Sequence, residues 1–367
     1  MNILNSIKNK SSNWWNKKIN SVKTFRDLPL GKKGELTKSF IGNNLLYILM
    51  VIMIIVIIIL EPSFIGINSV VNVIDLTAAK ILLALGVAGT IVLAGTDLSA
   101  GKIMAITACV GGSLAQSSNY AAKMWPNLTE SPIIVILLVC IVLGGLIGLF
   151  NGFITAHYKL HPFITTLGTQ LILTGIIMWY VTLGNNNGMN ISMMNDNYTH
   201  FIKGTWFKLG GVSIPYYVLY GVILTFVMWF IWNKTRFGKN MFAVGANEEA
   251  ARVSGVNVGL TVTLVFVLAG VYYGLGGFIE AVRVPSSGPS TAVGFELDAI
   301  SAAVIGGVSF VGGTGKIRGV VIGVFLLQII FTGLIFLGIA PYWTYVVKGA
   351  IILFAVALDM RKYMVKK

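Results

Sequence analysis

The stretch IIVILLVCIVLGGLIGLFNGF, residues Ile133–Phe153, decides the fold class of this chain. It runs for 21 residues without a charged side chain. Because a helix needs about 20 mostly apolar residues to cross the hydrocarbon core of a bilayer, the stretch predicts a transmembrane helix. Similar apolar windows recur at 41–60, 78–94, 102–115, 163–183, 216–232, 260–278, 299–311, 320–337 and 342–358.

These ten windows predict an all-α polytopic membrane protein with about ten transmembrane helices. Windows 102–115 and 299–311 are short or interrupted by glycine, so a re-entrant segment is the alternative to a full crossing there. Hydrophobic residues make up 56% of the 367 residues and charged residues 11%. Soluble domains are about 45–50% apolar and 25% charged, which argues against a water-soluble enzyme. Cys109 and Cys140 match no metal or disulfide spacing and are interpreted as small core residues.

The charged residues predict the orientation of the chain. The formal net charge is +14, and nine of the 27 Lys and Arg lie in a basic N-terminal tail, residues 1–40, that lacks a signal-peptide cleavage site. If this tail is cytoplasmic, 21 of the 27 Lys and Arg residues fall on the cytoplasmic side, including those of loop 234–258 and of a C-terminal tail, residues 361–367. The membrane domain is then predicted to extend over residues 41–360. The excess charge is therefore an orientation signal rather than a nucleic-acid site. The other six are assigned to outer loops and helix ends: Lys80, Lys123, Lys203, Lys208, Arg283 and Lys348.

Glycines at small-xxx-small spacing predict tight helix packing rather than a lined pore, because small residues let helix backbones approach in lipid. They are Gly144, Gly148 and Gly152, then Gly270 and Gly274, then Gly319 and Gly323. The glycine-rich segment Gly306–Gly319, GGVSFVGGTGKIRG, fails the spacing of a phosphate-binding loop. Phe310 stands where the first glycine is needed, and Ile317 follows Lys316 in place of Ser or Thr. We therefore predict no ATP site in this segment.

The motif GTDLSAG, Gly95–Gly101, predicts a tight turn between two apolar windows. Asp97 is costly at membrane depth unless it is paired, caps a helix or reaches the water interface. We expect Asp97 or Ser99 to cap a helix that begins near Ala100. Direct contact with a transported substrate is the alternative.

The polar loop Thr235–Val258 predicts a short charged helix. Asn247 is suited to cap it, Glu248 and Glu249 then lie in its first turn, and Arg252 follows Glu248 at i,i+4. A short helix lying parallel to the membrane is a surface on which an external partner can act. A solvated loop helix without a partner is the alternative.

Catalytic and metal constellations are absent from the sequence, and the three histidines lie in or beside loops. An ion-coupled carrier usually has acidic or histidine relays within the membrane, whereas Glu280, Glu296 and Asp298 lie at the predicted span ends. Uncharged polar side chains suit a neutral solute such as a sugar, with contacts between helices as the alternative role. These are Asn151, Gln170 and Gln328, with Trp179 and Tyr180 as aromatic partners.

Four runs resemble one known family: LAGTDLSAGKIMAI, TRFGKNMFAVGANEEAARVSGVNV, FELDAISAAVIGGVSFVGG and PYWTYVVKGAIILFAVALD. They look like the membrane permeases of bacterial sugar-importing ATP-binding cassette (ABC) systems, the ribose, xylose and galactose group. Within this group, the chain is most similar to the galactose/methylgalactoside permeases, and the similarity extends from about Ser69 to Tyr363. The basic tail has no counterpart in it.

The resemblance implies a subunit of the bacterial inner membrane that has no ATPase site, cofactor or metal of its own. It implies a homodimer with a path for a neutral sugar near the dimer axis, an extracytoplasmic sugar-binding protein and a separate ATPase subunit. It assigns ATPase coupling to Asn247, Glu248, Glu249, Ala250, Ala251 and Arg252. The candidate pathway residues are Asp97, Ser99, Asn151, Gln170, Trp179 and Gln328. An ion-coupled secondary sugar transporter is the alternative function.

Overall fold

The computed structural model describes residue 32 and residues 47–364. The predicted N-terminal tail, residues 1–40, lies outside the described residues apart from residue 32, and residues 365–367 of the C-terminal tail lie outside them as well. The chain divides into two units, Met1–Ile52 and Met53–Lys367. The helices, strands and loops that carry the candidate sites all belong to the second unit.

Each of the ten predicted windows contains a helix. Six helices are long and apolar enough to cross a membrane: α3 (Ile67–Val92), α5 (Ile133–Tyr158), α6 (Pro162–Tyr180), α8 (Tyr216–Lys234), α11 (Val258–Arg283) and α13 (Ile317–Phe336). The other four are shorter, or apolar over a shorter stretch: the helix Tyr47–Leu60, α4 (Ala100–Leu114), α12 (Phe295–Ile305) and α14 (Pro341–Met364). The fold is therefore that of a mostly helical membrane protein, and a crossing by all ten helices stays a prediction.

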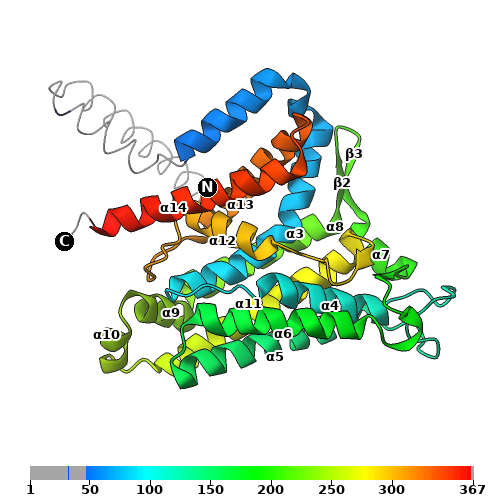
Figure 1. The fold of residues 1–367 in the computed structure, drawn as a ribbon, viewed down its shortest axis with the longest axis horizontal. Coiled ribbons are helices and arrows are strands. Elements are labelled where there is room, and N and C mark those ends of the chain that lie inside the picture. The colour runs from blue at the N-terminus through cyan, green and yellow to red at the C-terminus, as the bar shows by residue number, and fades with distance from the viewer. Residues whose placement is uncertain (1–31, 33–46, 365–367) are drawn as a thin grey trace, which may run out of the picture. The chain divides into compact units, whose positions relative to one another are not determined.

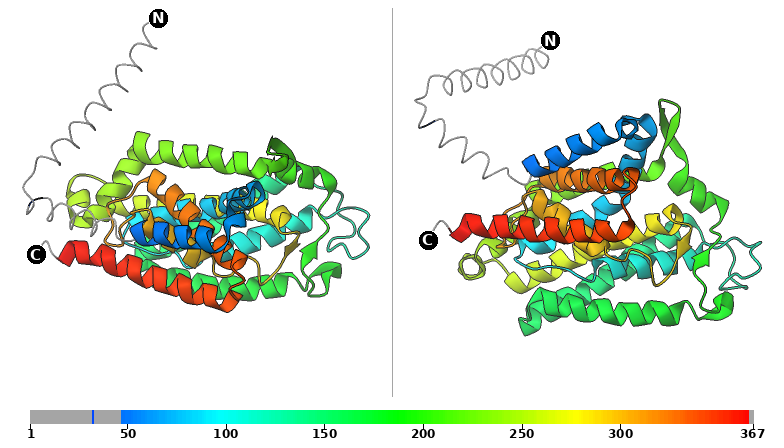
Figure 2. Two further views of the ribbon diagram at one scale, coloured as in Figure 1. Left: turned by 90° about the horizontal axis from the view of Figure 1, so that it is seen from above. Right: turned by 45° about the horizontal axis from the view of Figure 1, so that its top comes forward.

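The helices run between two ends of the bundle (Figures 1 and 2). One end, here the α10 end, carries α9 (Arg236–Ala246), α10 (Glu248–Val253) and the loop 306–316. The opposite end, here the strand end, carries the single-turn helix η2 (Gly184–Asn186), α7 (Asp196–Lys203) and two small antiparallel sheets; a further single turn, η1 (Pro62–Ile65), precedes α3. The sheets pair β1 (Ile191–Ser192) with β4 (Ser286–Ser287), and β2 (Thr205–Leu209) with β3 (Val212–Pro215).

Glycines bring α5 and α11 into backbone contact. A side chain at Gly144 would overlap the carbonyl oxygen of Gly270, and one at Gly148 would overlap that of Phe266. α11 also packs against α3 and α4, while α12 packs against α3, α13 and α14. At the contact of α12 with α13, a side chain at Gly319 would overlap the backbone of Gly306. The prediction that these glycines serve tight helix packing is confirmed.

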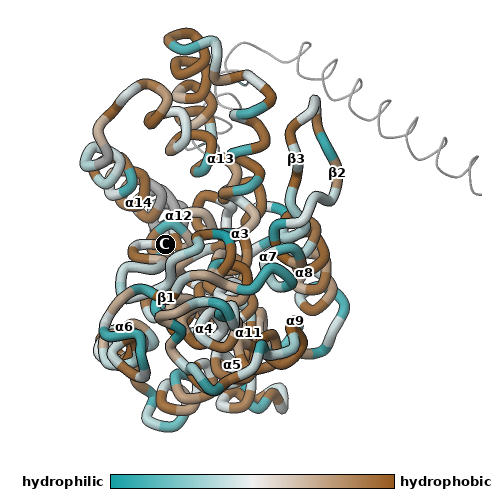
Figure 3. Tube along the Cα trace, turned by 90° about the vertical axis from the view of Figure 1, so that its right-hand side faces the viewer, coloured by the Kyte–Doolittle hydropathy of each residue, from teal (hydrophilic) through white to brown (hydrophobic). Residues whose placement is uncertain are grey.

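Apolar side chains cover the outward faces of the bundle. Figure 3 shows the helices as mainly hydrophobic, with hydrophilic stretches mainly in the segments between them. On α5, Leu138, Val142 and Leu146 are exposed although they lie in the most apolar window of the described chain. Such faces fit lipid or a second membrane-embedded chain, since water would oppose their exposure.

Two predictions about the charged residues are wrong. Lys80 lies in the middle of α3, because that helix begins at Ile67 rather than near residue 78, and Lys348 lies inside α14. Neither is in an outer loop or at a helix end. α12 occupies 295–305 rather than 299–311, so Asp298 falls inside a helix that packs against α3 and α14. The physical reason is an ion-pair cluster that joins these three charged residues.

Candidate coupling and translocation sites

The short helix α10 forms where the sequence predicts it. The Asn247 side-chain oxygen accepts a hydrogen bond from the Ala250 backbone N–H at 2.9 Å, and Glu248 and Glu249 lie in the first turn. Ala251 is buried against Val244 and Val258. The predicted cap is confirmed, and the buried alanine fixes α10 to the ends of α9 and α11.

The outer face of α10 is charged. Arg252 pairs with Glu248 at 2.6 Å and with Glu249 at 3.3 Å, which confirms the predicted i,i+4 contact. All three side chains are exposed, and Val253 beside them is 86% exposed. Because exposed ion pairs stabilise a protein by less than about 1 kcal/mol, these charges add little to the stability of the fold. They are accessible to a partner at the α10 end.

A buried chain of polar side chains joins the turn after α3 to α5 and α6. The Ser99 hydroxyl donates to Asp97 at 2.6 Å and accepts from the Asn151 amide at 2.9 Å. The Asn151 carbonyl oxygen accepts from the Thr169 hydroxyl at 2.6 Å. Each of the four residues is at least nine-tenths buried. Three of the predicted pathway residues, Asp97, Ser99 and Asn151, therefore form one hydrogen-bonded group.

The predicted cap of α4 is wrong in detail. The helix begins at Ala100, as expected, but the Asp97 carboxylate accepts from the Ser99 backbone N–H at 2.9 Å, and neither side chain caps the first turn. Asp97 lies in the loop between α3 and α4. Burial raises the pKa of its carboxyl group to about 6, while hydrogen bonds from the Ser99 hydroxyl and backbone N–H lower it. The Asp97 carboxylate therefore stabilises the turn that precedes α4 and does not cap the first turn of that helix.

The other three predicted pathway residues lie apart from this group. Gln170 is partly buried on α6, and Trp179 on the same helix is 60% exposed. Gln328 on α13 is buried, and its amide nitrogen donates to the Thr332 hydroxyl at 3.1 Å. Its side-chain oxygen is buried with no hydrogen-bond partner among the described residues. The aromatic candidate Tyr180 shares a hydrogen bond with Ser113 at 2.7 Å.

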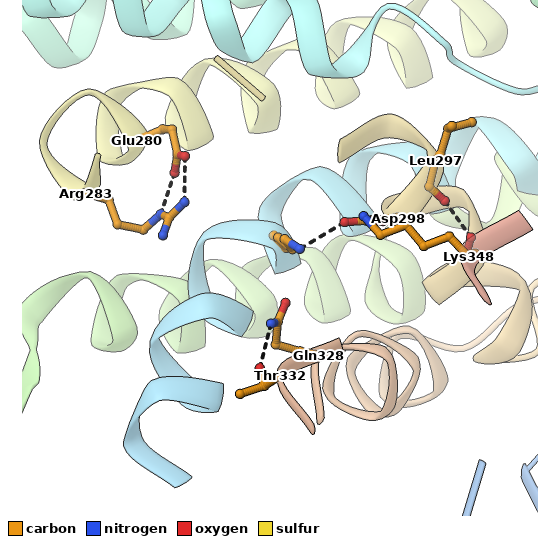
Figure 4. Close-up of polar contacts among 9 residues, drawn as sticks. Glu280, Arg283, Leu297, Asp298, Gln328, Thr332 and Lys348 are labelled. Atoms are coloured by element: carbon orange, nitrogen blue, oxygen red, sulfur yellow. Dashed lines mark hydrogen bonds and ion pairs between the residues drawn. The ribbon is translucent and has the colours of Figure 1, made fainter. Parts of the chain in front are cut away.

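The sequence did not reveal a buried ion-pair cluster of α3, α12 and α14. The Asp298 carboxylate, 5% exposed, lies 2.9 Å from the Lys80 ammonium and 2.7 Å from that of Lys348 (Figure 4). The ring of Phe331 lies within 6.0 Å of both ammonium groups, and that of Phe295 lies 5.0 Å from Lys80. Because two lysines face one carboxylate, these rings offset the excess positive charge.

The cluster borders a small cavity. Its volume is about 10 Å³, and Lys80, Asp298 and Gln328 supply its polar lining. That volume corresponds to about one water molecule, so the cavity is too small for a sugar. A second buried pair joins Glu280 to Arg283 at the strand end of α11 through two contacts, of 2.6 and 2.7 Å (Figure 4). Within the described residues, no group of His, Cys, Asp or Glu is arranged to hold a metal ion.

The polar turn, the charged helix α10 and the ion-pair cluster all fall within one family match. The family described as "Branched-chain amino acid transport system / permease component" matches residues 69–356. The chain belongs to this permease family. The match covers the six long apolar helices almost entirely, so the permease is an integral membrane transport subunit rather than a soluble protein.

The permease is similar over most of its length to named sugar permeases. It is 43% identical to the galactose/methyl galactoside import permease of Escherichia coli, over 92% of this chain and 99% of that one. It is 39% identical to the protein of the same name from Haemophilus influenzae, over 91% and 99% of the two chains. The ribose import permease of Escherichia coli is 33% identical over 89% and 96%. No solved structure matches the chain significantly.

Proposed function

We propose that this permease forms the translocation path for galactose or methyl galactoside in an ABC importer, driven by a separate ATPase subunit. The support is the pair of relatives named for these sugars, which match nearly end to end at 39–43% identity. The buried group of Asp97, Ser99, Asn151 and Thr169 is rich in hydroxyl and amide groups, which suit a neutral hydroxylated solute. Gln170, Trp179 and Gln328 stay candidate contacts elsewhere along the path.

The observation that carries the coupling role is the geometry of α10. It is a capped, anchored helix with an exposed charged face, at the end of the bundle where Lys and Arg gather. Those Lys and Arg are Lys159, Lys234, Arg236, Lys239, Arg252, Lys316 and Arg318. By the positive-inside rule the α10 end is cytoplasmic, where an ATPase subunit binds. We assign the contact with that subunit to Asn247, Glu248, Glu249, Ala250, Ala251 and Arg252.

The proposed importer contains two copies of this chain and receives sugar from an extracytoplasmic binding protein at the strand end. The outward apolar faces of α5, α6 and α8 give a second copy a membrane-embedded surface to pack against. With both termini cytoplasmic, the ten helices are expected to form the crossings, and α12 is short enough to be re-entrant.

Transport is expected to follow alternating access. ATP binding closes the ATPase pair, α10 moves with it, and the helices attached to α10 reorient the path from one side of the membrane to the other. The free energy difference between the two states comes from nucleotide chemistry on the partner, since a conformational equilibrium shifts only by differential binding.

The test of this proposal is the triple variant Glu248→Ala, Glu249→Ala, Arg252→Ala, expressed together with the ATPase subunit and the binding protein. We expect normal membrane insertion, loss of the ATPase subunit on purification and loss of galactose uptake. The matched control removes two exposed charges at the strand end, Lys203→Ala with Lys208→Ala, and should retain the ATPase subunit. Normal uptake by the triple variant would show that α10 is not the coupling element.

A further inference from the structure

Three backbone segments come into close contact at the α10 end of the bundle. They are the end of α3 at Val92, the end of α9 at Gly245 and Ala246, and the glycine-rich loop at Gly312 and Gly313. The Gly313 N–H donates to the Val92 carbonyl oxygen at 2.8 Å. A side chain at Gly245 would overlap that same oxygen and lie 2.9 Å from the Gly313 nitrogen. We name this contact the backbone junction.

The glycines of the junction are required by space and by backbone conformation. A β-carbon at Gly312 would lie 2.5 Å from the carbonyl oxygen of Gly245, and one at Gly313 would lie 2.6 Å from the α-carbon of Ala246. Gly312 has φ of +90° and Gly313 of +67°, which side chains disfavour. The glycine-rich segment, which lacks the spacing of a phosphate-binding loop, thus makes a packing contact that requires its glycines.

The junction connects elements that are far apart in the sequence. On one side, Ala246 is followed directly by Asn247, the cap of α10. On the other side, the loop continues from α12, which carries Asp298, and Val92 ends α3, which carries Lys80. The junction therefore places the residues just before α10 against the end of α3 and against the loop that follows α12, and α3 and α12 are the two helices that share a buried ion pair.

Backbone contacts transmit displacement with little loss. A side chain between two segments can change rotamer and absorb a shift, whereas backbone atoms already in van der Waals contact cannot. Neither α9 nor α10 is adjacent in sequence to α12. The junction is a direct contact between the end of α9, which leads into α10, and the loop that continues from α12. A movement of α10 must press on the loop or open the junction.

We propose that the backbone junction is the positioning contact that passes the movement of α10 to α12 and α3 during transport. The inference rests on the proposed function, because it requires α10 to be driven by an ATPase subunit. It assigns to Gly245, Gly312 and Gly313 a role in coupling that is separate from binding of the partner. Contact with the ATPase subunit is assigned to α10 and its cap, whereas the junction glycines lie at the end of α9 and in the loop after α12.

Two matched pairs of variants test the junction. Gly312→Ala and Gly307→Ala change the same loop at similar φ, +90° and +84°, but a β-carbon at Gly307 meets no atom within 4 Å. Gly245→Ala changes the last turn of α9, just before α10, and Gly255→Ala changes the turn just after α10, where Gly255 is likewise open at φ of +83°. The controls carry the backbone strain without the contact.

The assay uses the permease with its ATPase subunit and binding protein in proteoliposomes, and measures galactose imported per ATP hydrolysed. We expect Gly312→Ala and Gly245→Ala to retain the ATPase subunit and to hydrolyse ATP, while the ratio falls roughly fivefold or more. The two controls should keep the ratio of the unchanged protein. A ratio for Gly312→Ala equal to that of Gly307→Ala, or loss of the ATPase subunit from the junction variants, would overturn the inference.

A milder variant, Gly315→Ala, keeps the inference testable if the junction variants do not fold. A β-carbon at Gly315 would lie 3.2–3.3 Å from side-chain ends of Val308 and Val92, which can shift. Gly315→Ala is therefore expected to fold and to lower the ratio by a smaller factor, and an unchanged ratio would count against the junction. Absence of ATP-dependent uptake by the unchanged protein would contradict the proposed function itself, and the junction with it. Normal uptake by the unchanged protein together with normal junction variants would overturn the junction alone.

Discussion

Replacing Asp298 with asparagine is expected to destabilise the permease far more than replacing Lys348 with methionine. The cluster holds two ammonium groups and one carboxylate, at 2.9 Å and 2.7 Å. Its net charge is +1. Asp298→Asn raises that charge to +2, whereas Lys348→Met lowers it to zero and leaves the pair of Lys80 with Asp298 intact.

The magnitude follows from burial. Asp298 is 5% exposed and both lysines are less than a quarter exposed, so removal of the carboxylate leaves two largely desolvated cations facing each other. Breaking a buried pair in this way costs about 3–5 kcal/mol. Loss of Lys348 leaves a neutral pair and a side chain of similar volume, and is expected to cost about 1–2 kcal/mol. The two variants should therefore differ by at least about 1 kcal/mol.

The assay is thermal unfolding of the purified permease in detergent. At about 2 °C per kcal/mol for a chain of this size, the Asp298→Asn midpoint should fall by about 6–10 °C and the Lys348→Met midpoint by about 2–4 °C. Glu249→Gln, which removes an exposed carboxylate from α10, is the matched control and should shift the midpoint by less than about 2 °C. Equal midpoints for Asp298→Asn and Glu249→Gln would refute the reasoning that the cluster is a buried, carboxylate-dependent tie.

Three further outcomes are expected. Asn247→Ala removes the α10 cap, which costs about 1 kcal/mol locally, and should lower galactose uptake at a constant amount of inserted protein; unchanged uptake would argue against a rigid coupling helix. Gly148→Leu forces α5 away from α11 and should abolish a monodisperse peak in size-exclusion chromatography, whereas Gly168→Ala, which meets no atom within 4 Å, should leave the peak unchanged. Asn151→Leu leaves the hydroxyl of Ser99 without its donor and should lower the unfolding midpoint by about 2–6 °C, and a smaller effect would mean that the polar group is dispensable for stability.

Local patterns explain what the sequence predicts well. The apolar windows mark helices because hydropathy and length are properties of a continuous stretch, as in Ile133–Phe153. The α10 helix is predicted together with its cap and ion pair because Asn247, Ala250 and Arg252 lie within six residues of one another. The spacing of Gly144 and Gly148 predicts that α5 packs closely against another helix, but it does not identify α11 as that helix.

Contacts between distant segments escape such patterns. Lys80 and Asp298 are 218 residues apart, so nothing near either residue shows that they pair. The same holds for Gly312, whose partners lie at the ends of α3 and α9. The 60% exposure of Trp179 is not predictable either, because α6 is apolar on most of its faces and its sequence marks no buried side. The cap predicted from Asp97 failed because Ser99 instead bonds Asn151 on another helix.

The most direct test of the central claim is the energy source of transport. The purified permease, reconstituted in proteoliposomes with its ATPase subunit and binding protein, should take up galactose only when ATP is supplied. That uptake should persist when ionophores abolish proton and sodium gradients. Uptake by the permease alone, driven by an ion gradient and independent of ATP, would contradict the account and identify an ion-coupled carrier.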